Sequence, residues 1–268
     1  MISVLSWNIL GPATRDVADY GFIPGDYGRL GKHLKMIQQY QADILCFQEI
    51  DLTSLHLFNS FLLSEYIQAS YHEKGAHGGV AVYVRTSIFD VVNSIGTTLQ
   101  TSENYSPGAF SGTIVKNKID GIEIFVASVH LSKSVHPQSV EKGVNQVFDL
   151  CKSLGSNLPS KVILVGDYNT MYNDMKEVIL PIMSKELNKN LFLFEYESCV
   201  SPDISGEVSS IDHVVYSGMN IDLEKSCVIT LENHRFQTEL KKDDKAPSQD
   251  DQNKQLPSDH SPLLVFLK

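Results

Sequence analysis

The sequence predicts an α/β fold built as a single domain over residues 1–268, and two observations support this prediction. Short runs of apolar, β-branched residues alternate along the chain with longer segments of helical periodicity. The chain has 268 residues, of which 42% are hydrophobic. It is therefore long enough to bury a large core, and it lies near the upper size limit for one domain.

The predicted strands are short, rich in β-branched residues and bounded by turn residues. They cover residues 2–9, 42–50, 78–85, 122–131, 161–168, 210–217 and 261–267. Helices are expected between several of them, over residues 27–40, 52–66 and 137–154. In the last segment Val140, Val144 and Val147 recur at helical intervals. The polar segment 239–255 is expected to be a solvated loop, and the Gly-rich and polar stretches 72–80 and 102–112 are expected to connect strands.

Composition narrows the class of protein. No apolar run approaches the roughly 18 residues of a membrane span, and no charged leader precedes the first strand. The four cysteines, Cys46, Cys151, Cys199 and Cys227, show no C-x-x-C spacing, which favours free thiols and a reducing, cytoplasmic location. The net charge of −10 argues against binding nucleic acid through a broad basic surface. It is compatible with an enzyme that engages one or two phosphates, and we expect it to be a monomer without membrane contacts.

Acidic, amide and imidazole side chains recur where predicted strands begin or end. They are Asn8 in "SWNIL", Glu49 in "FQEID", His130 in "SVHLS", Asp167 and Asn169 in "GDYNT", Asp212 in "IDHV", and Asp259 and His260 in "PSDHSP". Neighbouring strands can bring such ends into one cleft. The set is rich in oxygen ligands and poor in thiolates, which suits Mg²⁺ or Mn²⁺ better than zinc. Hydrolysis of a phosphate ester is the chemistry that fits this set best.

Each of these motifs alone has an ordinary structural explanation. Asn8 alone would be a turn residue, Glu49 a helix-start acid and "DYNT" an Asx turn. His130 alone would be a core histidine, and "SD" before a strand would be turn chemistry. Six motifs of matching chemistry at strand boundaries are harder to attribute to turns. We therefore interpret them together as one site.

The ordered series "SWNIL", "FQEID", "VHL", "GDYN", "IDH" and "SDHSPLL" resembles the endonuclease/exonuclease/phosphatase superfamily over nearly the whole chain. The segment 6–51, with "YGRLGKHLKMIQQYQADILCFQEID", is most similar to its deadenylase, nocturnin and Angel branch, although "GDYN" and "IDHV" replace the more usual "GDFN" and "IDYI". The resemblance implies a deoxyribonuclease I-like fold. This fold is a four-layer sandwich of two packed mixed β-sheets flanked by helices, with the site at one end of the sheets.

The resemblance also implies roles for the site residues. Glu49 would be the principal carboxylate for a Mg²⁺ or Mn²⁺ ion, with Asn8 and Asp259 completing the metal shell. Asp167 would orient or deprotonate the attacking water, and Asn169 would hold that water or a phosphoryl oxygen. The scissile phosphate would be contacted by His260, whose tautomer Asp212 would fix, and by His130 as a second donor. No covalent nucleophile is required.

The expected substrate follows from the same branch. We expect a phosphodiesterase acting on RNA 3′ ends, poly(A) among them, or on small adenine-containing nucleotides, with RNA favoured over DNA. One alternative is a DNA-directed nuclease, or a phospholipid or inositol phosphate hydrolase, of the same superfamily. Another is a metal-binding module that has kept the fold without the chemistry.

Overall fold

Two mixed β-sheets of six strands each form the centre of the computed structural model. The model describes residues 1–12, 27–75, 78–99, 107–131, 143–147, 149–151, 158–194, 201–202, 208–209, 211–229, 260 and 262–268. The first sheet has the order β13-β14-β1-β2-β4-β3 and the second the order β5-β6-β7-β8-β12-β9. Each sheet has one parallel pair near its centre, β1 with β2 and β7 with β8, and its other pairs are antiparallel.

The strands of the first sheet are β1 (Ile2–Asn8), β2 (Ile44–Ile50), β3 (Tyr66–Glu73), β4 (Gly79–Arg85), β13 (Cys227–Val228) and β14 (Leu263–Leu267). Those of the second are β5 (Phe89–Leu99), β6 (Gly108–Asn117), β7 (Glu123–His130), β8 (Lys161–Asp167), β9 (Phe192–Leu193) and β12 (Asp212–Ser217). A separate short pair consists of β10 (Ser201–Pro202) and β11 (Val208–Ser209).

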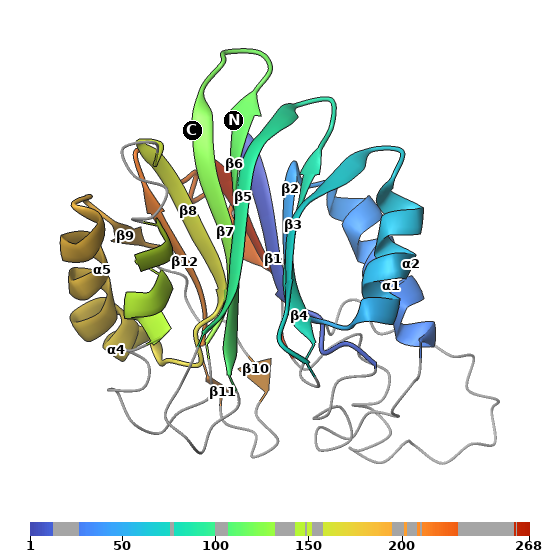
Figure 1. Ribbon diagram of the computed structural model, residues 1–268, viewed down its shortest axis with the longest axis horizontal. Coiled ribbons are helices and arrows are strands. Elements are labelled where there is room, and N and C mark those ends of the chain that lie inside the picture. Colours follow the sequence, from blue (N-terminus) through green and yellow to red (C-terminus); the bar gives the residue numbers. More distant parts are fainter. Residues whose placement is uncertain are drawn as a thin grey trace.

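Helices cover the outer face of each sheet (Figure 1). On the first sheet lie α1 (Gly28–Tyr40) and α2 (Leu52–Leu62), whose apolar side chains share one core cluster with Leu5, Trp7 and Phe47. On the second lie α4 (Tyr172–Asp174), the π-helical turn Met175–Ile179, α5 (Leu180–Leu187) and the helical residues 143–147 and 149–151. Their cluster includes Phe125 and Leu164. The order of layers is therefore helices, sheet, sheet, helices.

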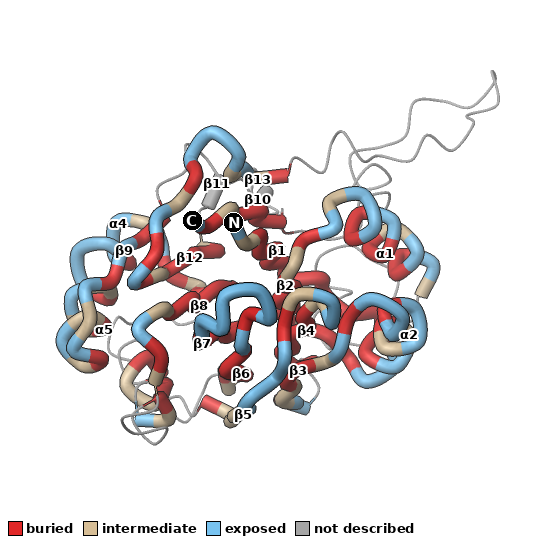
Figure 2. The backbone as a smooth tube through the Cα atoms, turned by 90° about the horizontal axis from the view of Figure 1, so that it is seen from above, coloured by how far each residue is buried: buried red, intermediate tan, exposed pale blue. Residues whose placement is uncertain are grey.

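The two sheets pack face to face through a third apolar cluster, which contains Val4, Cys46, Ile163 and Val165. Side chains alternate along each strand, so β1 sends Val4 toward the other sheet and Leu5 toward the helices. Seen from above, the two sheets are rows of buried strands with exposed segments at the periphery (Figure 2). This alternation decides which side chains of each strand reach the space between the sheets.

The four-layer α/β architecture predicted from the sequence is confirmed, as are the seven predicted strands and the helices that begin near residues 27 and 52. Of the predicted helix 137–154, the described residues 143–147 and 149–151 are helical. Three long strands, β3, β5 and β6, were not predicted, nor was the helical segment 172–187. The single-domain assignment stays a prediction.

Two of these omissions have clear physical reasons. Strand β5 lies at a sheet edge and exposes most of its residues, so it lacks the apolar run expected of a strand. The prediction that 102–112 is a connection was wrong for residues 108–112, which belong to β6, where Gly112 leaves room for the Phe125 ring. Of the stretch 72–80, residues 72–73 belong to β3 and residues 79–80 to β4, so the connection between these strands is shorter than expected.

The remaining predictions concern thiols, loops and membrane contacts. Cys46, Cys151 and Cys227 are free thiols, and Cys199 lies outside the described residues, as does the segment 239–255. No helix in the described part of the chain is long and apolar enough to cross a membrane.

Candidate active site

The second sheet places three of the predicted residues in one row. His130, the last residue of β7, pairs with Asp167, the last residue of β8, and Asp167 pairs with Asp212, the first residue of β12. Asp167 is two and four residues beyond Val165 and Ile163, which pack between the sheets. The alternation of the strand therefore directs Asp167 into the space between the sheets, at the end opposite the chain termini.

The first sheet contributes Asn8 and Glu49, and only Asn8 follows the simple alternation. Asn8 is in phase with Val4, which faces the second sheet. Glu49 follows Gln48, whose amide donates to Ser128 Oγ of the second sheet at 2.9 Å, so a regular strand would turn Glu49 toward the helices. The pairing of β2 with β4 instead shifts between Gln48 and Ile50, and Glu49 has φ 54°. This β-bulge directs the carboxylate of Glu49 into the site.

Gly78 makes room for this bulge. It has φ +73°, and a Cβ atom there would lie 2.7 Å from the carbonyl carbon of Glu49. Any side chain at this position would collide with the backbone that presents the carboxylate, and it would also have to adopt a left-handed conformation. The glycine of "HGGV" thus has a direct role in placing Glu49.

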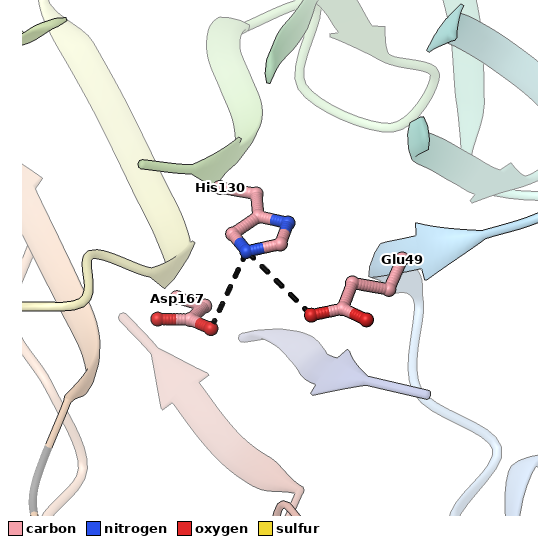
Figure 3. Close-up of side chains that lie close together, drawn as sticks. All are labelled: Glu49, His130 and Asp167. Carbon is pink, nitrogen blue, oxygen red and sulfur yellow. Dashed lines mark ion pairs between the residues drawn. The ribbon is translucent and has the colours of Figure 1, made fainter. Parts of the chain in front are cut away.

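The carboxylates of Glu49 and Asp167 and the imidazole of His130 converge at the centre of the site (Figure 3). His130 Nε2 lies 3.6 Å from both Glu49 Oε1 and Asp167 Oδ2. The side-chain amide of Asn8 donates to Glu49 Oε1 at 2.9 Å and to Asp167 Oδ2 at 3.1 Å, while its oxygen accepts the N–H of Leu10 at 3.1 Å. Asn8 thus connects the two carboxylates, one from each sheet.

His260 and Asp212 form a second pair beside this centre. His260 Nδ1 lies 2.7 Å from Asp212 Oδ2, and the carbonyl of His260 accepts the indole N–H of Trp7 at 2.9 Å. A carboxylate at this distance holds the proton on Nδ1 and favours the charged form of the ring. His260 Nε2 then points toward Asp167 Oδ2, 3.9 Å away.

Asn169 lies in the turn that follows β8. The strand ends at Asp167, and Asn169 adopts φ 48°, a conformation that asparagine tolerates better than most residues. Its backbone N–H donates to Asp167 Oδ1 at 2.8 Å, and its side-chain amide donates to the carbonyl of Leu131 at 2.7 Å. The Asx turn thereby holds one oxygen of Asp167 and leaves the other for the site.

Asp167 is the most perturbed carboxyl of the site. Burial raises its pKa from 3.8 to about 7, and the negative charges of Asp212 and Glu49 act in the same direction. The neighbouring His260 and the N–H of Asn169 act against this rise. A carboxyl whose pKa lies near neutrality is suited to accept a proton from water.

Lys74 is a site residue that the sequence analysis missed. It follows β3 and is buried, and its Nζ lies 2.7 Å from His130 Nδ1 and 3.4 Å from Nε2. An ammonium group can only donate, so the shorter contact makes Nδ1 an acceptor and leaves the ring proton on Nε2. His130 therefore presents an N–H toward the two carboxylates. No sequence motif marked Lys74, which lies in a polar stretch between two strands.

The donor set fits a divalent cation. Carboxylate oxygens of Glu49 and Asp167 lie within 4.8 Å of each other and of a ring nitrogen of His130, and Asp167, Asp212 and His260 form a second such group. Oxygen atoms bound to one Mg²⁺ at about 2.0–2.1 Å are separated by no more than roughly 4 Å, so the two carboxylates, its usual protein ligands, would draw together on an ion. Asp259, predicted as a further ligand, lies outside the described residues. The structure brings together the other seven predicted site residues, Asn8, Glu49, His130, Asp167, Asn169, Asp212 and His260.

Comparisons with known proteins give the family and the fold. A family model described as "Endonuclease/Exonuclease/phosphatase family" matches residues 5–260. The catalytic domain of human Nocturnin, solved with a bound sulfate anion, superposes with a TM-score of 0.69 at 20% identity, covering 100% of this chain and 93% of the other. A mannosyl-6-phosphatase of Bacteroides thetaiotaomicron gives 0.69 at 20% identity with 100% of both chains covered.

A third similar structure is D. rerio TDP2 complexed with a single-strand DNA product, with a TM-score of 0.67, 16% identity and coverage of 100% of this chain and 98% of the other. The search of curated protein sequences gave no significant match. At these identities the solved structures show the fold.

Proposed function

The chain belongs to the endonuclease/exonuclease/phosphatase family, whose members are hydrolases of phosphodiester or phosphate ester bonds, and we propose that it is a Mg²⁺- or Mn²⁺-dependent phosphodiesterase. The observation that carries the proposal is the convergence of Glu49, Asp167 and His130 at the end of two facing sheets, with the ligand atoms within 4.8 Å of one another. Phosphoryl transfer needs a cation site and hydrogen-bond donors to the phosphoryl oxygens. Here the two carboxylates supply the cation site, and the protonated ring nitrogens supply the donors.

In this proposal Glu49 is the principal metal carboxylate, with Asn8 and Asp259 as further ligands. The cation supplies positive charge to the phosphoryl oxygens when it is bound. In the arrangement described, the amide oxygen of Asn8 accepts the N–H of Leu10 and its NH₂ group faces the carboxylates. Ligation through that oxygen would require the amide to turn over.

The other residues act on water and on the phosphate. Asp167 accepts a proton from the attacking water, because burial has brought its pKa to about 7. Asn169 holds Asp167 Oδ1 through its N–H, and in this proposal it also contacts the water or a phosphoryl oxygen. His130 donates its Nε2–H to the phosphate, because Lys74 occupies Nδ1, and His260 donates from Nε2 in its charged form, with its Nδ1–H held by Asp212.

We propose RNA 3′ ends or small adenine-containing nucleotides as substrates. The resemblance of the segment 6–51 to the deadenylase and nocturnin branch, and the structural likeness to Nocturnin, support this choice. The net charge of −10 favours a short or small substrate over a long nucleic acid. A sugar phosphomonoester is a second candidate, because the mannosyl-6-phosphatase structure matches over the whole of both chains.

A panel of substrates with Mg²⁺ or Mn²⁺ tests the proposal. It contains poly(A), mixed RNA, RNA with a terminal cyclic phosphate, nucleotide cofactors, single-stranded DNA and mannose 6-phosphate. Asp167→Ala serves as the control for contaminating nucleases and should lose at least about 10²-fold in kcat. Release of nucleotides supports a phosphodiesterase, whereas release of inorganic phosphate from the sugar alone supports the second candidate. Metal binding without turnover of any substrate would contradict both.

A further inference from the structure

His213 is a buried histidine that the proposed chemistry does not use. It follows Asp212 in β12, is fully buried, and faces the outer layer rather than the space between the sheets. Its ring lies beside those of Tyr168 and Tyr172, with centroids 5.8 and 6.2 Å away. An apolar residue would suit such surroundings better, so a polar ring here calls for an explanation.

The ring makes one short hydrogen bond. His213 Nε2 lies 2.6 Å from the carbonyl oxygen of Thr170, so Nε2 carries the proton and donates it. Nδ1 is buried and has no hydrogen-bond partner among the described residues. Burial lowers the pKa of His213 to about 4, which keeps the ring neutral at physiological pH. Nδ1 is thus an unsatisfied acceptor, while Nε2 forms the hydrogen bond to Thr170.

Thr170 belongs to the turn that presents Asn169 to the site. The turn is held at Tyr168, whose N–H donates to the carbonyl of Ile211 at 2.9 Å, and at Thr170, whose hydroxyl donates to the carbonyl of Tyr168 at 2.9 Å. Between them, Asn169 adopts φ 48° and donates its N–H to Asp167 Oδ1. The bond from His213 fixes the far side of this turn to β12, the strand that also carries Asp212.

We propose that His213 is a positioning residue that acts through Thr170 and Asn169 to orient the Asp167 carboxylate. Without this bond the turn can relax from its left-handed conformation, and Asp167 Oδ2 loses its fixed direction toward Asn8, His130 and His260. This role deepens the proposed function and rests on it, because the effect of His213 on kcat can be measured only if the protein is a phosphodiesterase. The protonation state of His213 can be observed without activity.

Two amide substitutions that differ in side-chain length test whether the hydrogen bond from position 213 to Thr170 is needed. In His213→Gln the amide nitrogen can occupy the position of Nε2 and donate to Thr170, whereas in His213→Asn the amide reaches only the position of Nδ1. We expect the Gln variant to keep kcat within about threefold of wild type. The Asn variant should lose about 10- to 100-fold in kcat with KM within about twofold, because a small misplacement of a reacting group has an effect of this order.

Val215→Ala is the matched control for stability. Val215 is buried in the same strand and the same outer cluster, but it does not contact the turn through a side-chain hydrogen bond. It should lower the unfolding midpoint without changing kcat at a temperature where all variants are folded. If the Asn and Gln variants have equal kcat, or if Val215→Ala lowers kcat as much as His213→Asn, the positioning role is wrong.

The tautomer can be observed without any substrate or metal. Long-range ¹H–¹⁵N correlation spectra of the metal-free protein should show His213 as a neutral ring protonated at Nε2 between pH 6 and 8. A charged ring, or a proton at Nδ1, would overturn the inference even if the enzyme is active. Conversely, an inactive wild-type protein with the expected tautomer would count against the proposed function and leave the hydrogen bond established.

Discussion

Replacing Asp167 with Asn should stabilise the metal-free protein while abolishing its activity. Asp167 is buried, and Asp212 and Glu49 add like charges near it, so its pKa rises from 3.8 to about 7. One pKa unit corresponds to about 1.36 kcal/mol between the two protonation states. At pH 8 the shift of roughly three units makes the ionised carboxyl unfavourable for folding by roughly 4 kcal/mol, as an upper limit.

The dependence on pH follows from the raised pKa. Well below pH 3.8, the pKa of the carboxyl in the unfolded state, the carboxyl is protonated in the folded and unfolded states alike, and no penalty exists. As the pH rises from about 4 to about 7, the unfolded state ionises first and stability falls, and above the folded pKa the loss is complete. The difference in unfolding free energy between Asp167→Asn and wild type should therefore shrink from roughly 4 kcal/mol at pH 8 to roughly 2 kcal/mol at pH 5.

Urea unfolding in the presence of a chelator measures this difference at both pH values. Asp90→Asn is the control, because the Asp90 side chain is 65% exposed and its ion pair with Lys118 is worth little. It should change stability by less than about 1 kcal/mol at either pH. An Asp167→Asn variant that is no more stable than wild type at pH 8, or a difference that does not shrink at pH 5, would refute the reasoning.

Three further changes test other parts of the site. Gly78→Ala should lower stability by about 1–3 kcal/mol and reduce activity, because its Cβ would displace the backbone of Glu49; an unchanged melting temperature and rate would contradict this. Lys74→Met should reduce kcat by about 10²-fold in a folded protein, because His130 loses the group that keeps its proton on Nε2; equal rates would exclude this role. Burial lowers the pKa of His213 from 6.5 to about 4, so on acidification the unfolded state binds a proton at this ring before the folded state does. Between pH 7 and pH 4 wild type should therefore lose about 3 kcal/mol of stability that His213→Gln does not lose. Unfolding free energies of the two proteins that fall in parallel over this range would contradict this.

Much of the site could be predicted because strand alternation is visible in the sequence. In "KVILVGD" the residues Ile163, Val165 and Asp167 share one face, so placing Ile163 and Val165 between two sheets also places the carboxylate there. His130 follows from the same alternation in β7, and Asn8 from that in β1. Alternation alone does not determine which strands are neighbours in a sheet. The order of the strands was inferred from the family resemblance.

Two parts of the site depend on contacts that no local pattern reveals. Lys74 is buried against His130 at the end of β7, and His130 is 56 residues away in the sequence. Similarly, "IDHV" looks like an ordinary strand start, and the role of His213 emerges only when the turn after β8 is seen to meet it. Polar residues that act across layers have no periodic signature, since their partners lie in other segments of the chain.

For Glu49, the strand pattern identifies a site residue but predicts the wrong face of the sheet for its side chain. By alternation, Gln48 faces the second sheet and Glu49 faces α1 and α2, where a carboxylate would be buried among apolar side chains at a high cost. The bulge resolves this conflict by inserting Glu49 as an extra residue opposite β4, with Gly78 packed against its backbone. The left-handed backbone of Glu49 is a local strain that the surrounding pairs must maintain, as is common at functional sites. The placement of the proposed metal carboxylate therefore depends on a glycine in another strand connection, and not on the sequence "FQEID" alone.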